Sequence, residues 1–131
     1  MTLEHFFDPK SIAVVGASRE PGKVGYEIFT ALCKAGFEGP LYPVNPNARQ
    51  IEGLTCYPDL KAIGAVPDLV VVVVAAKRVL PVIKECADIG VHAAVIVSSG
   101  FKESGQDGAK MEQEIMRVAR AAGIRIIGPN C

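Results

Sequence analysis

An apolar strand followed by three glycines occupies residues 14–27, whose sequence is VVGASREPGKVGYE. The nicotinamide fingerprint, G-x-G-x-x-G, would continue from Gly16 with glycines at positions 18 and 21. Ser18 and Pro21 stand at those positions instead. The loop therefore has the composition of a phosphate-binding turn but lacks the glycine spacing of a nicotinamide site.

The same loop combines glycine with positive charge at a predicted helix start. Gly16 lets the chain turn sharply off the strand, and Gly25 lets the following helix lie close to that strand. A helix N-terminus carries about half a positive charge and free N–H groups, which attract phosphate. Ser18 can cap the helix or donate a hydrogen bond, and Arg19 and Lys23 add positive charge. We interpret the loop as a phosphate site rather than as an ordinary turn that merely requires glycine.

The end of the second predicted strand, residues 42–49, reads YPVNPNAR. Nicotinamide-binding folds usually place an acid there to hold the ribose hydroxyls. Asn45 is neutral, and the next charged side chain is that of Arg49. This loop favours a ligand with a phosphate on its ribose, a condition that both NADP and coenzyme A (through its 3′-phosphate) meet. An ordinary surface Asx-Pro turn explains the same residues equally well.

Two further loops follow later predicted strands. Residues 74–79, VAAKRV, present small side chains against which a flat ring can lie, although tight strand–helix packing explains them as well. Residues 98–105, SSGFKESG, place two hydroxyls and a glycine after a strand, which indicates a polar loop that a ligand approaches closely. His5 belongs to the N-terminal tail, and His92 begins a strand away from the ligand side. The sequence therefore predicts a binding site without catalytic residues and without metal ligands.

Composition excludes several classes of partner. Fourteen basic residues balance fourteen acidic ones in 131 residues, so no basic surplus draws nucleic acid or an anionic membrane to the surface. The longest apolar run, residues 69–76, is shorter than the roughly 18 residues of a membrane helix. The N-terminus lacks the pattern of a secretory signal, and the four cysteines form no C-x-x-C pair. Reduced thiols in a cytoplasmic protein are expected.

Strand-like and helix-like segments alternate along the chain. Strands are predicted at residues 11–16, 39–46, 68–76, 91–100 and 124–131, and helices at 22–36, 77–90 and 106–123. Residues 47–64 are expected to form a loop with one short helix from about Pro58. This alternation predicts an α/β fold: a Rossmann-like, doubly wound parallel sheet of five strands that forms a single domain over residues 1–131.

The predicted fold also locates the ligand. Doubly wound sheets bind ligands beyond the carboxyl ends of their strands, where the strand order reverses. We expect the first strand and the strand at 91–100 to flank that reversal. The loops after Gly16 and Ser98 then build the site, and the loops after Val44 and Val74 extend it. The chain ends in GPNC directly after its last predicted strand, which indicates the N-terminal part of a longer protein.

Five motifs in register support a family resemblance. They are PKSIAVVGAS (9–18), PGKVGYEI (21–28), YPVNPNARQIEGLTCYPDL (42–60), SSGFKESG (98–105) and RIIGPNC (125–131). From about Asp8 to Cys131 the sequence resembles the CoA-binding domain of NDP-forming acyl-CoA synthetases, typified by ADP-forming acetate–CoA ligase. It is more distantly similar to the succinyl-CoA synthetase alpha subunit.

The resemblance implies that coenzyme A is the ligand. The family interconverts acyl-CoA, NDP and phosphate with a carboxylic acid, CoA and NTP, and it passes a phosphoryl group through a histidine. By the resemblance, that histidine lies in a following domain, and an ATP-grasp domain or subunit is a further partner. The present chain would hold CoA for thioester formation, and alone it is expected to be inactive.

The resemblance also assigns residues to parts of the ligand. It implies that the nucleotide loop consists of Gly16, Ala17, Ser18, Arg19 and Gly25, and that Asn45 and Pro46 lie at the ribose and 3′-phosphate. It places Ala75, Ala76 and Lys77 near the adenine. Along the pantetheine arm it places Ser98, Ser99, Gly100 and Phe101. Relatives often have proline at Ala75 and a basic residue at Asn47. The phosphate partner is therefore expected to be Arg49 or Lys23.

Three other functions stay open at the level of sequence. An NAD(P)-binding redox or sensor domain is disfavoured by the glycine spacing and by the missing acid after the second strand. The same module also opens some bacterial protein lysine acetyltransferases. A standalone protein that responds to CoA occupancy is the third alternative.

Overall fold

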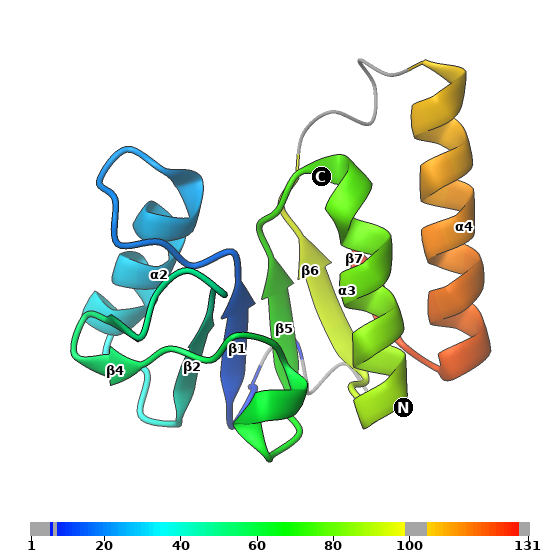
Figure 1. The fold of residues 1–131 in the computed structure, drawn as a ribbon. Coiled ribbons are helices and arrows are strands. Elements are labelled where there is room, and N and C mark those ends of the chain that lie inside the picture. The colour runs from blue at the N-terminus through cyan, green and yellow to red at the C-terminus, as the bar shows by residue number, and fades with distance from the viewer. Residues whose placement is uncertain (1–5, 7, 99–104, 129–131) are drawn as a thin grey trace.

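The computed structural model describes residues 6, 8–98 and 105–128. Figure 1 shows a parallel sheet of five strands with helices on both faces. The strands are β1 (Ile12–Val15), β2 (Leu41–Val44), β5 (Leu69–Val72), β6 (Ala93–Ile96) and β7 (Arg125–Ile127), and the helices are α2 (Val24–Lys34), α3 (Ala76–Ile89) and α4 (Gln106–Ala122). The predicted α/β fold with a doubly wound five-stranded sheet is confirmed.

Strands β1 and β5 form the centre of the sheet, and every residue of both strands is buried. Their side chains alternate between two hydrophobic clusters. Ile12 and Val14 share one cluster with Phe29 of α2, whereas Ala13 shares the other with Ile83 of α3 and Ile115 of α4. Because both faces are covered, these strands are apolar throughout rather than alternately polar and apolar.

The strand order is β2-β1-β5-β6-β7, so the reversal falls between β1 and β5. The expectation that β1 and the strand at 91–100 flank the reversal is therefore wrong. The reason lies at the outer edge of β2, where the Tyr57 N–H donates to the Pro43 carbonyl at 2.9 Å. The Asn45 N–H donates in turn to the Tyr57 carbonyl, also at 2.9 Å. With this edge occupied, the third long strand pairs with the other side of β1.

The segment between β2 and β5 contains structure that the sequence analysis did not find. Strands β3 (Gln50–Ile51) and β4 (Leu54–Thr55) form an antiparallel hairpin. Its two turn residues, Glu52 and Gly53, have φ values of 52° and 77°, as a two-residue hairpin turn of the primed type requires. Two-residue strands are too short to show an alternating pattern. The helix expected from Pro58 is a single 3₁₀ turn, η1 (Lys61–Ile63).

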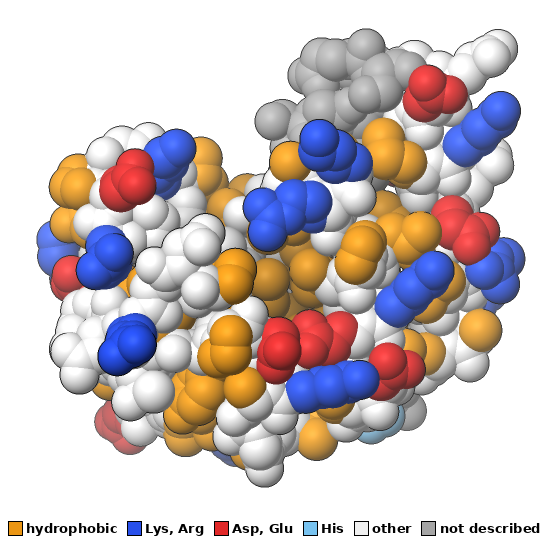
Figure 2. All heavy atoms as spheres, in the orientation of Figure 1, with side chains coloured by type: hydrophobic (Ala, Val, Ile, Leu, Met, Phe, Trp, Pro, Cys, Tyr) orange, Lys and Arg blue, Asp and Glu red, His pale blue; other side chains and the backbone are white. Residues whose placement is uncertain are grey.

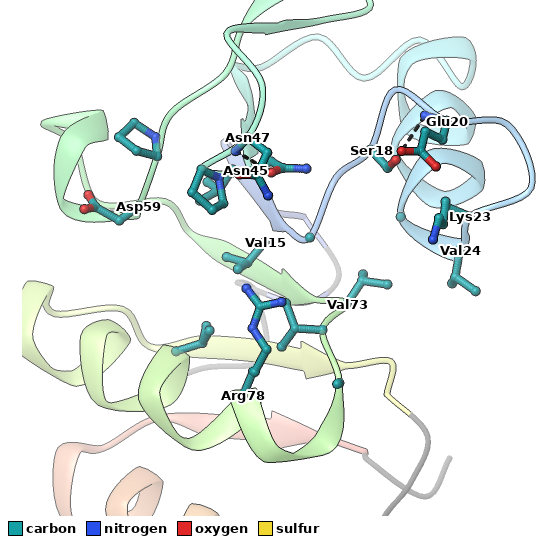
Figure 3. A pocket seen from close by; sticks show the side chains of 18 of the residues that line it. Val15, Ser18, Glu20, Lys23, Val24, Asn45, Asn47, Asp59, Val73 and Arg78 are labelled. Atoms are coloured by element: carbon teal, nitrogen blue, oxygen red, sulfur yellow. Dashed lines mark hydrogen bonds between the residues drawn. The ribbon is translucent and has the colours of Figure 1, made fainter.

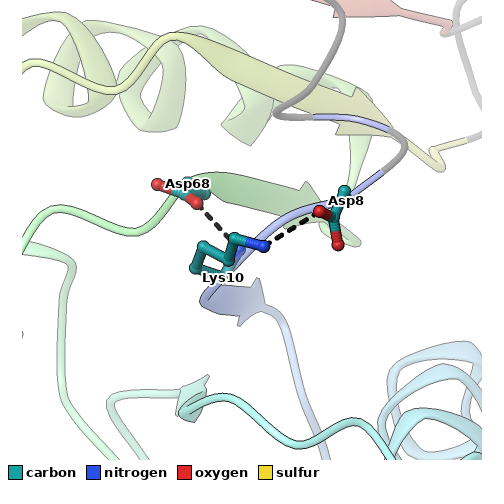
Figure 4. Close-up of polar contacts among 3 residues, drawn as sticks. All are labelled: Asp8, Lys10 and Asp68. Atoms are coloured by element: carbon teal, nitrogen blue, oxygen red, sulfur yellow. Dashed lines mark hydrogen bonds and ion pairs between the residues drawn. The ribbon is translucent and has the colours of Figure 1, made fainter.

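Side-chain hydrogen bonds join β1 to β5 where the two strands begin (Figure 4). The backbone N–H of Lys10 donates to Asp68 Oδ2 at 2.7 Å, and the Asp68 N–H donates to Ser11 Oγ at 3.0 Å. These reciprocal bonds lie one step before the first register pair, Ile12 with Leu69. They therefore hold the two central strands in register at the end of the sheet opposite the strands' carboxyl termini.

We expect Asp68→Ala to lower the free energy of unfolding by about 1 kcal/mol, because it removes the acceptor for the Lys10 N–H. The matched control is Asp8→Ala. Asp8 forms an exposed ion pair with Lys10 at 2.9 Å, so its loss should change stability by less than about 0.5 kcal/mol. Urea unfolding of the two variants and the wild type measures both effects. Equal effects would contradict a role of Asp68 in strand registration.

Candidate ligand-binding cleft

A cleft of about 490 Å³ opens at the carboxyl ends of β1, β2 and β5 (Figure 3). It lies between the start of α2 and the start of α3, at the reversal of strand order, where doubly wound folds bind ligands. Three chain segments form its walls: Gly16, Ser18, Glu20, Lys23, Val24 and Gly25; Asn45, Pro46, Asn47, Pro58 and Asp59; and Val73, Val74, Ala75, Arg78, Val82 and Glu85.

Two glycines let backbone contact backbone in the first wall. Gly16 has a φ of +98°, and a Cβ at this position would lie 2.0 Å from the Val73 carbonyl oxygen. A Cβ at Gly25 would lie 1.9 Å from the carbonyl oxygen of Gly16. No larger residue fits either position without displacing backbone. As the sequence predicts, Gly16 turns the chain off β1 and Gly25 brings α2 close to that turn.

The N-termini of two helices face the cleft. Helix α2 begins after Lys23 and helix α3 after Ala75, and neither N-cap residue makes a side-chain capping bond. The first N–H groups of a helix have no partner within the helix, and together with the helix dipole they attract anions. Ser18, expected as a possible cap of α2, instead accepts a hydrogen bond from the Glu20 N–H at 3.0 Å (Figure 3). The ends of both helices are thus available to an anionic ligand.

Charge changes sign along the cleft. Lys23 and Arg78 lie beside the two helix starts, with the acidic Glu20 near Lys23, whereas Asp59 and Glu85 lie farther down the groove. Figure 2 shows basic side chains above the central hollow and acidic ones below it. Both of these carboxylates bind η1, because Asp59 Oδ1 accepts from Ala62 N at 2.9 Å and Glu85 Oε2 accepts from Lys61 N at 3.1 Å. The part of the cleft between the helix starts is therefore the part suited to phosphate.

A second cavity of about 730 Å³ adjoins the first. It is lined by Arg19, Asn47, Ala48, Arg49, Gln50 and Thr55, and Asn47 lines both cavities. The two arginines come from different loops, and among the described residues no acidic side chain lines the cavity in which they meet. This pairing is a tertiary feature, since thirty residues of chain separate Arg19 from Arg49.

The structure places the residues expected to bind the ligand in three settings: lining the cleft, lining the second cavity, or away from both. Those that line the cleft are Gly16, Ser18, Lys23, Gly25, Asn45, Pro46 and Ala75, and those that line the second cavity are Arg19 and Arg49. Ala17 and Ala76 are buried behind the walls. Lys77 is exposed and does not line the cleft, whereas its neighbour Arg78 does.

Only the first residues of the loop after β6 belong to the part of the chain that the structure describes. Ser98 is absent from the lining of the cleft, and its hydroxyl donates to the Val74 carbonyl. Ser99, Gly100 and Phe101 lie outside the described residues. The loop after β5, expected to extend the site, lies directly beside the glycine loop, because β5 adjoins β1.

Sequence reasoning missed one side of α3. Arg78, Val82 and Glu85 recur at helical spacing and all line the cleft. This periodicity is visible in the sequence, but the sequence does not tell which side of the helix faces a ligand. Pro58 and Asp59 were also missed, because their segment was expected to form a loop with one short helix and no ligand contact was assigned to it.

The cysteine thiols near the cleft are unsuited to act as nucleophiles. Burial, together with nearby Glu85, raises the pKa of Cys86 to about 12. Burial also raises the pKa of Cys56, although its hydrogen bond to the Asn45 carbonyl and the nearby Arg19 oppose the increase. Since a thiol reacts as its thiolate, both groups are largely unreactive at neutral pH.

In the part of the chain that the structure describes, no three His, Cys, Asp or Glu side chains are grouped as metal ligands. Among the same residues, no helix combines the length and the hydrophobicity needed to cross a membrane.

Comparison with known proteins identifies the ligand class. Residues 10–131 match the family model described as a CoA binding domain. The chain is 49% identical over 128 residues to acetate–CoA ligase [ADP-forming] II of Archaeoglobus fulgidus, covering 98% of this chain and 19% of the relative. It is 46% identical to the alpha subunit of acetate–CoA ligase [ADP-forming] I of Pyrococcus furiosus, covering 99% of this chain and 29% of the subunit.

A solved structure agrees with these relatives. The apo form of dinucleotide-forming acetyl-coenzyme A synthetase 1 of Candidatus Korarchaeum cryptofilum superimposes with a TM-score of 0.92 at 43% identity. That match covers 98% of this chain and 28% of the synthetase chain. The present chain thus spans less than a third of each of these relatives. The comparisons do not support an NAD(P)-dependent redox domain or a lysine acetyltransferase. By its sequence and its fold, the chain belongs to the family of CoA-binding domains.

Proposed function

We propose that this domain holds coenzyme A for thioester formation in an NDP-forming acyl-CoA ligase of the ADP-forming acetate–CoA ligase type. The observation that carries the proposal is the meeting of two uncapped helix N-termini across a glycine loop, with Lys23 and Arg78 beside them. The resemblance to ADP-forming acetate–CoA ligases over nearly the whole chain supports the same conclusion.

The cleft suits the pyrophosphate of CoA. Gly16 and Gly25 lack side chains where the ligand must approach the backbone, so phosphate oxygens can reach the N–H groups at the start of α2. Helix α3 offers a second set of N–H groups after Ala75. In this proposal Lys23 and Arg78 neutralise the pyrophosphate. The resemblance placed Lys77, the neighbour of Arg78, near the adenine, and Lys77 does not line the cleft.

We assign the 3′-phosphate of CoA to the second cavity, between Arg19 and Arg49. A ribose beside Asn45–Asn47 would present its phosphate to this cavity, because Asn47 lines both spaces. Guanidinium groups suit phosphate because their donors match its oxygens in pairs. The pantetheine arm would then leave the cleft toward Ser98, where the described part of the loop after β6 ends.

The remaining chemistry is assigned to other domains. In the proposed reaction a carboxylic acid, CoA and NTP are interconverted with acyl-CoA, NDP and phosphate, and the phosphoryl group passes through a histidine. His92 directly precedes β6 at the amino end of that strand, whereas the cleft opens at the carboxyl ends. We therefore place the phosphohistidine and the ATP-grasp fold in partners beyond residues 1–131.

The first test is ligand preference. We expect the domain to bind CoA at least about tenfold more tightly than NADH in calorimetric titration, because CoA carries a ribose phosphate and no acid follows β2 to hold a ribose diol. NADP is the control, since it shares a ribose phosphate with CoA but not the rest of the molecule. Tighter binding of NADH than of CoA would refute the proposal.

The second test concerns the 3′-phosphate. Dephospho-CoA should bind more weakly than CoA by roughly 1.5–3 kcal/mol, the range for a hydrogen bond to a charged group. Arg19→Ala and Arg49→Ala should each shrink that difference, because both side chains line the second cavity. Lys23→Ala is the matched control and should weaken both ligands alike. If only Lys23→Ala shrinks the difference, the 3′-phosphate lies at the helix start instead.

The third test is the absence of turnover. The isolated domain should form neither acetyl-CoA nor phosphohistidine when it is given acetyl phosphate and CoA, or ATP, acetate and CoA. At about 3.3 Å per residue, roughly 20 Å of strand separates His92 from Ser98, far beyond hydrogen-bond reach. Product that appears with the wild type and disappears with His92→Ala would overturn this assignment.

A further inference from the structure

Asn45 connects the two loops that face each other across the cleft mouth. Its side-chain Nδ2 donates to the Ala17 carbonyl at 2.9 Å, and its Oδ1 accepts from the Asn47 N–H at 2.8 Å. Its backbone N–H donates to the Tyr57 carbonyl at 2.9 Å. One residue therefore joins the glycine loop, the loop after β2 and the segment that pairs with the edge of β2.

The bond to Ala17 spans the site. Ala17 is fully buried between Gly16 and Ser18, both of which line the first wall. Its carbonyl is a buried acceptor, and such groups are almost always paired. On the other side, the bond to the Asn47 N–H shapes the loop that lines both cavities. The side-chain amide of Asn45 thus holds the glycine loop, which we propose binds the pyrophosphate, against the loop after β2, which we propose lies beside the ribose phosphate.

This geometry gives a physical reason for a neutral residue at the end of β2. An ionised aspartate there could still accept from the Asn47 N–H, but it has no donor for the Ala17 carbonyl. Its second oxygen would then face a carbonyl oxygen. An acid that could hold a ribose diol is therefore incompatible with the contact that this glycine loop makes.

We propose that Asn45 is a positioning residue that fixes the glycine loop against residues 45–49 and thereby sets the selectivity of the cleft for CoA. This inference rests on the proposed function. It differs from a direct contact between Asn45 and the ribose, because the amide is engaged by the protein on both sides.

Three substitutions separate geometry from charge. Asn45→Asp keeps the acceptor for Asn47 and loses the donor to Ala17, whereas Asn45→Leu has a similar shape and loses both. Asn47→Asp is the charge control, since it adds the same charge two residues away without touching the Ala17 bond. CoA and NADH titrations are run at about 0.1 M and about 1 M sodium chloride, because screening at about 1 M reduces the Debye length to about 3 Å.

We expect both Asn45 variants to bind CoA about tenfold more weakly than the wild type at either salt concentration, a loss equivalent to one contact with a charged phosphate. The CoA affinity of Asn47→Asp should return to within about threefold of the wild-type affinity at high salt, because screening reduces the effect of the added charge. At about 1 M sodium chloride the CoA-to-NADH affinity ratio should stay lowered only in the Asn45 variants, because the charge effect of Asn47→Asp is then screened. A purely structural role would lower the unfolding temperature without changing the affinity of the folded protein.

The wild type supplies a readout that does not depend on any variant folding. By NMR, the Asn45 side-chain amide protons should stay protected from exchange and keep their bond to the Ala17 carbonyl when CoA is added. Transfer of that bond to the ligand, or Asn45 variants that fold and bind CoA as the wild type does, would overturn the inference. Failure of the wild type to bind CoA would instead refute the proposed function.

Discussion

The structure depends on a backbone contact at the reversal of strand order. Gly16 approaches the carbonyl of Val73, and Gly25 approaches the carbonyl of Gly16, so closely that a Cβ at either position would lie about 2 Å from an oxygen. These contacts bring the end of β1, the start of α2 and the end of β5 together without intervening side chains. The space that remains beyond them is the cleft.

This constraint determines the electrostatics of the cleft. Because the loops are short and close, the first turns of α2 and α3 both reach the cleft with no side-chain cap. Their N–H groups supply fixed positive potential that does not titrate, and Lys23 and Arg78 add to it. Asp59 and Glu85 bind the backbone of η1, and burial raises the pKa of the nearby Cys86 thiol. These features suit the binding of an anionic ligand, in agreement with the match to a CoA binding domain.

The loop after β2 also makes contacts within the protein. Asn45 uses its side chain to join loops rather than to project into solvent, and the hairpin β3–β4 carries Arg49 next to Arg19. A helix in this part of the chain would have left no edge contact for β2 and no second cavity. The departure from a regular β-α-β unit is therefore what creates the region that we assign to the ribose phosphate.

The main elements of the fold and the glycine turn were predicted from the sequence. The alternation of apolar strands and amphipathic helices predicted the five-stranded parallel sheet, and the positions of Gly16 and Gly25 predicted the close turn. These features are local, because periodicity and a missing Cβ act within a few residues. The five motifs in register also indicated the family, because their order and spacing along the chain are properties of the sequence itself, and the family match supports that interpretation.

The tertiary structure decided what depends on contacts between distant segments. The neighbour of β1 is β5 rather than β6 because Tyr57 occupies the edge of β2, and no local pattern encodes that pairing. Arg78 rather than Lys77 faces the cleft because α3 packs on the sheet with a particular rotation. Arg19 and Arg49 share a cavity only because a hairpin of two-residue strands brings their loops together. Residue types set the chemistry that is available, whereas long-range packing selects which of those residues meet.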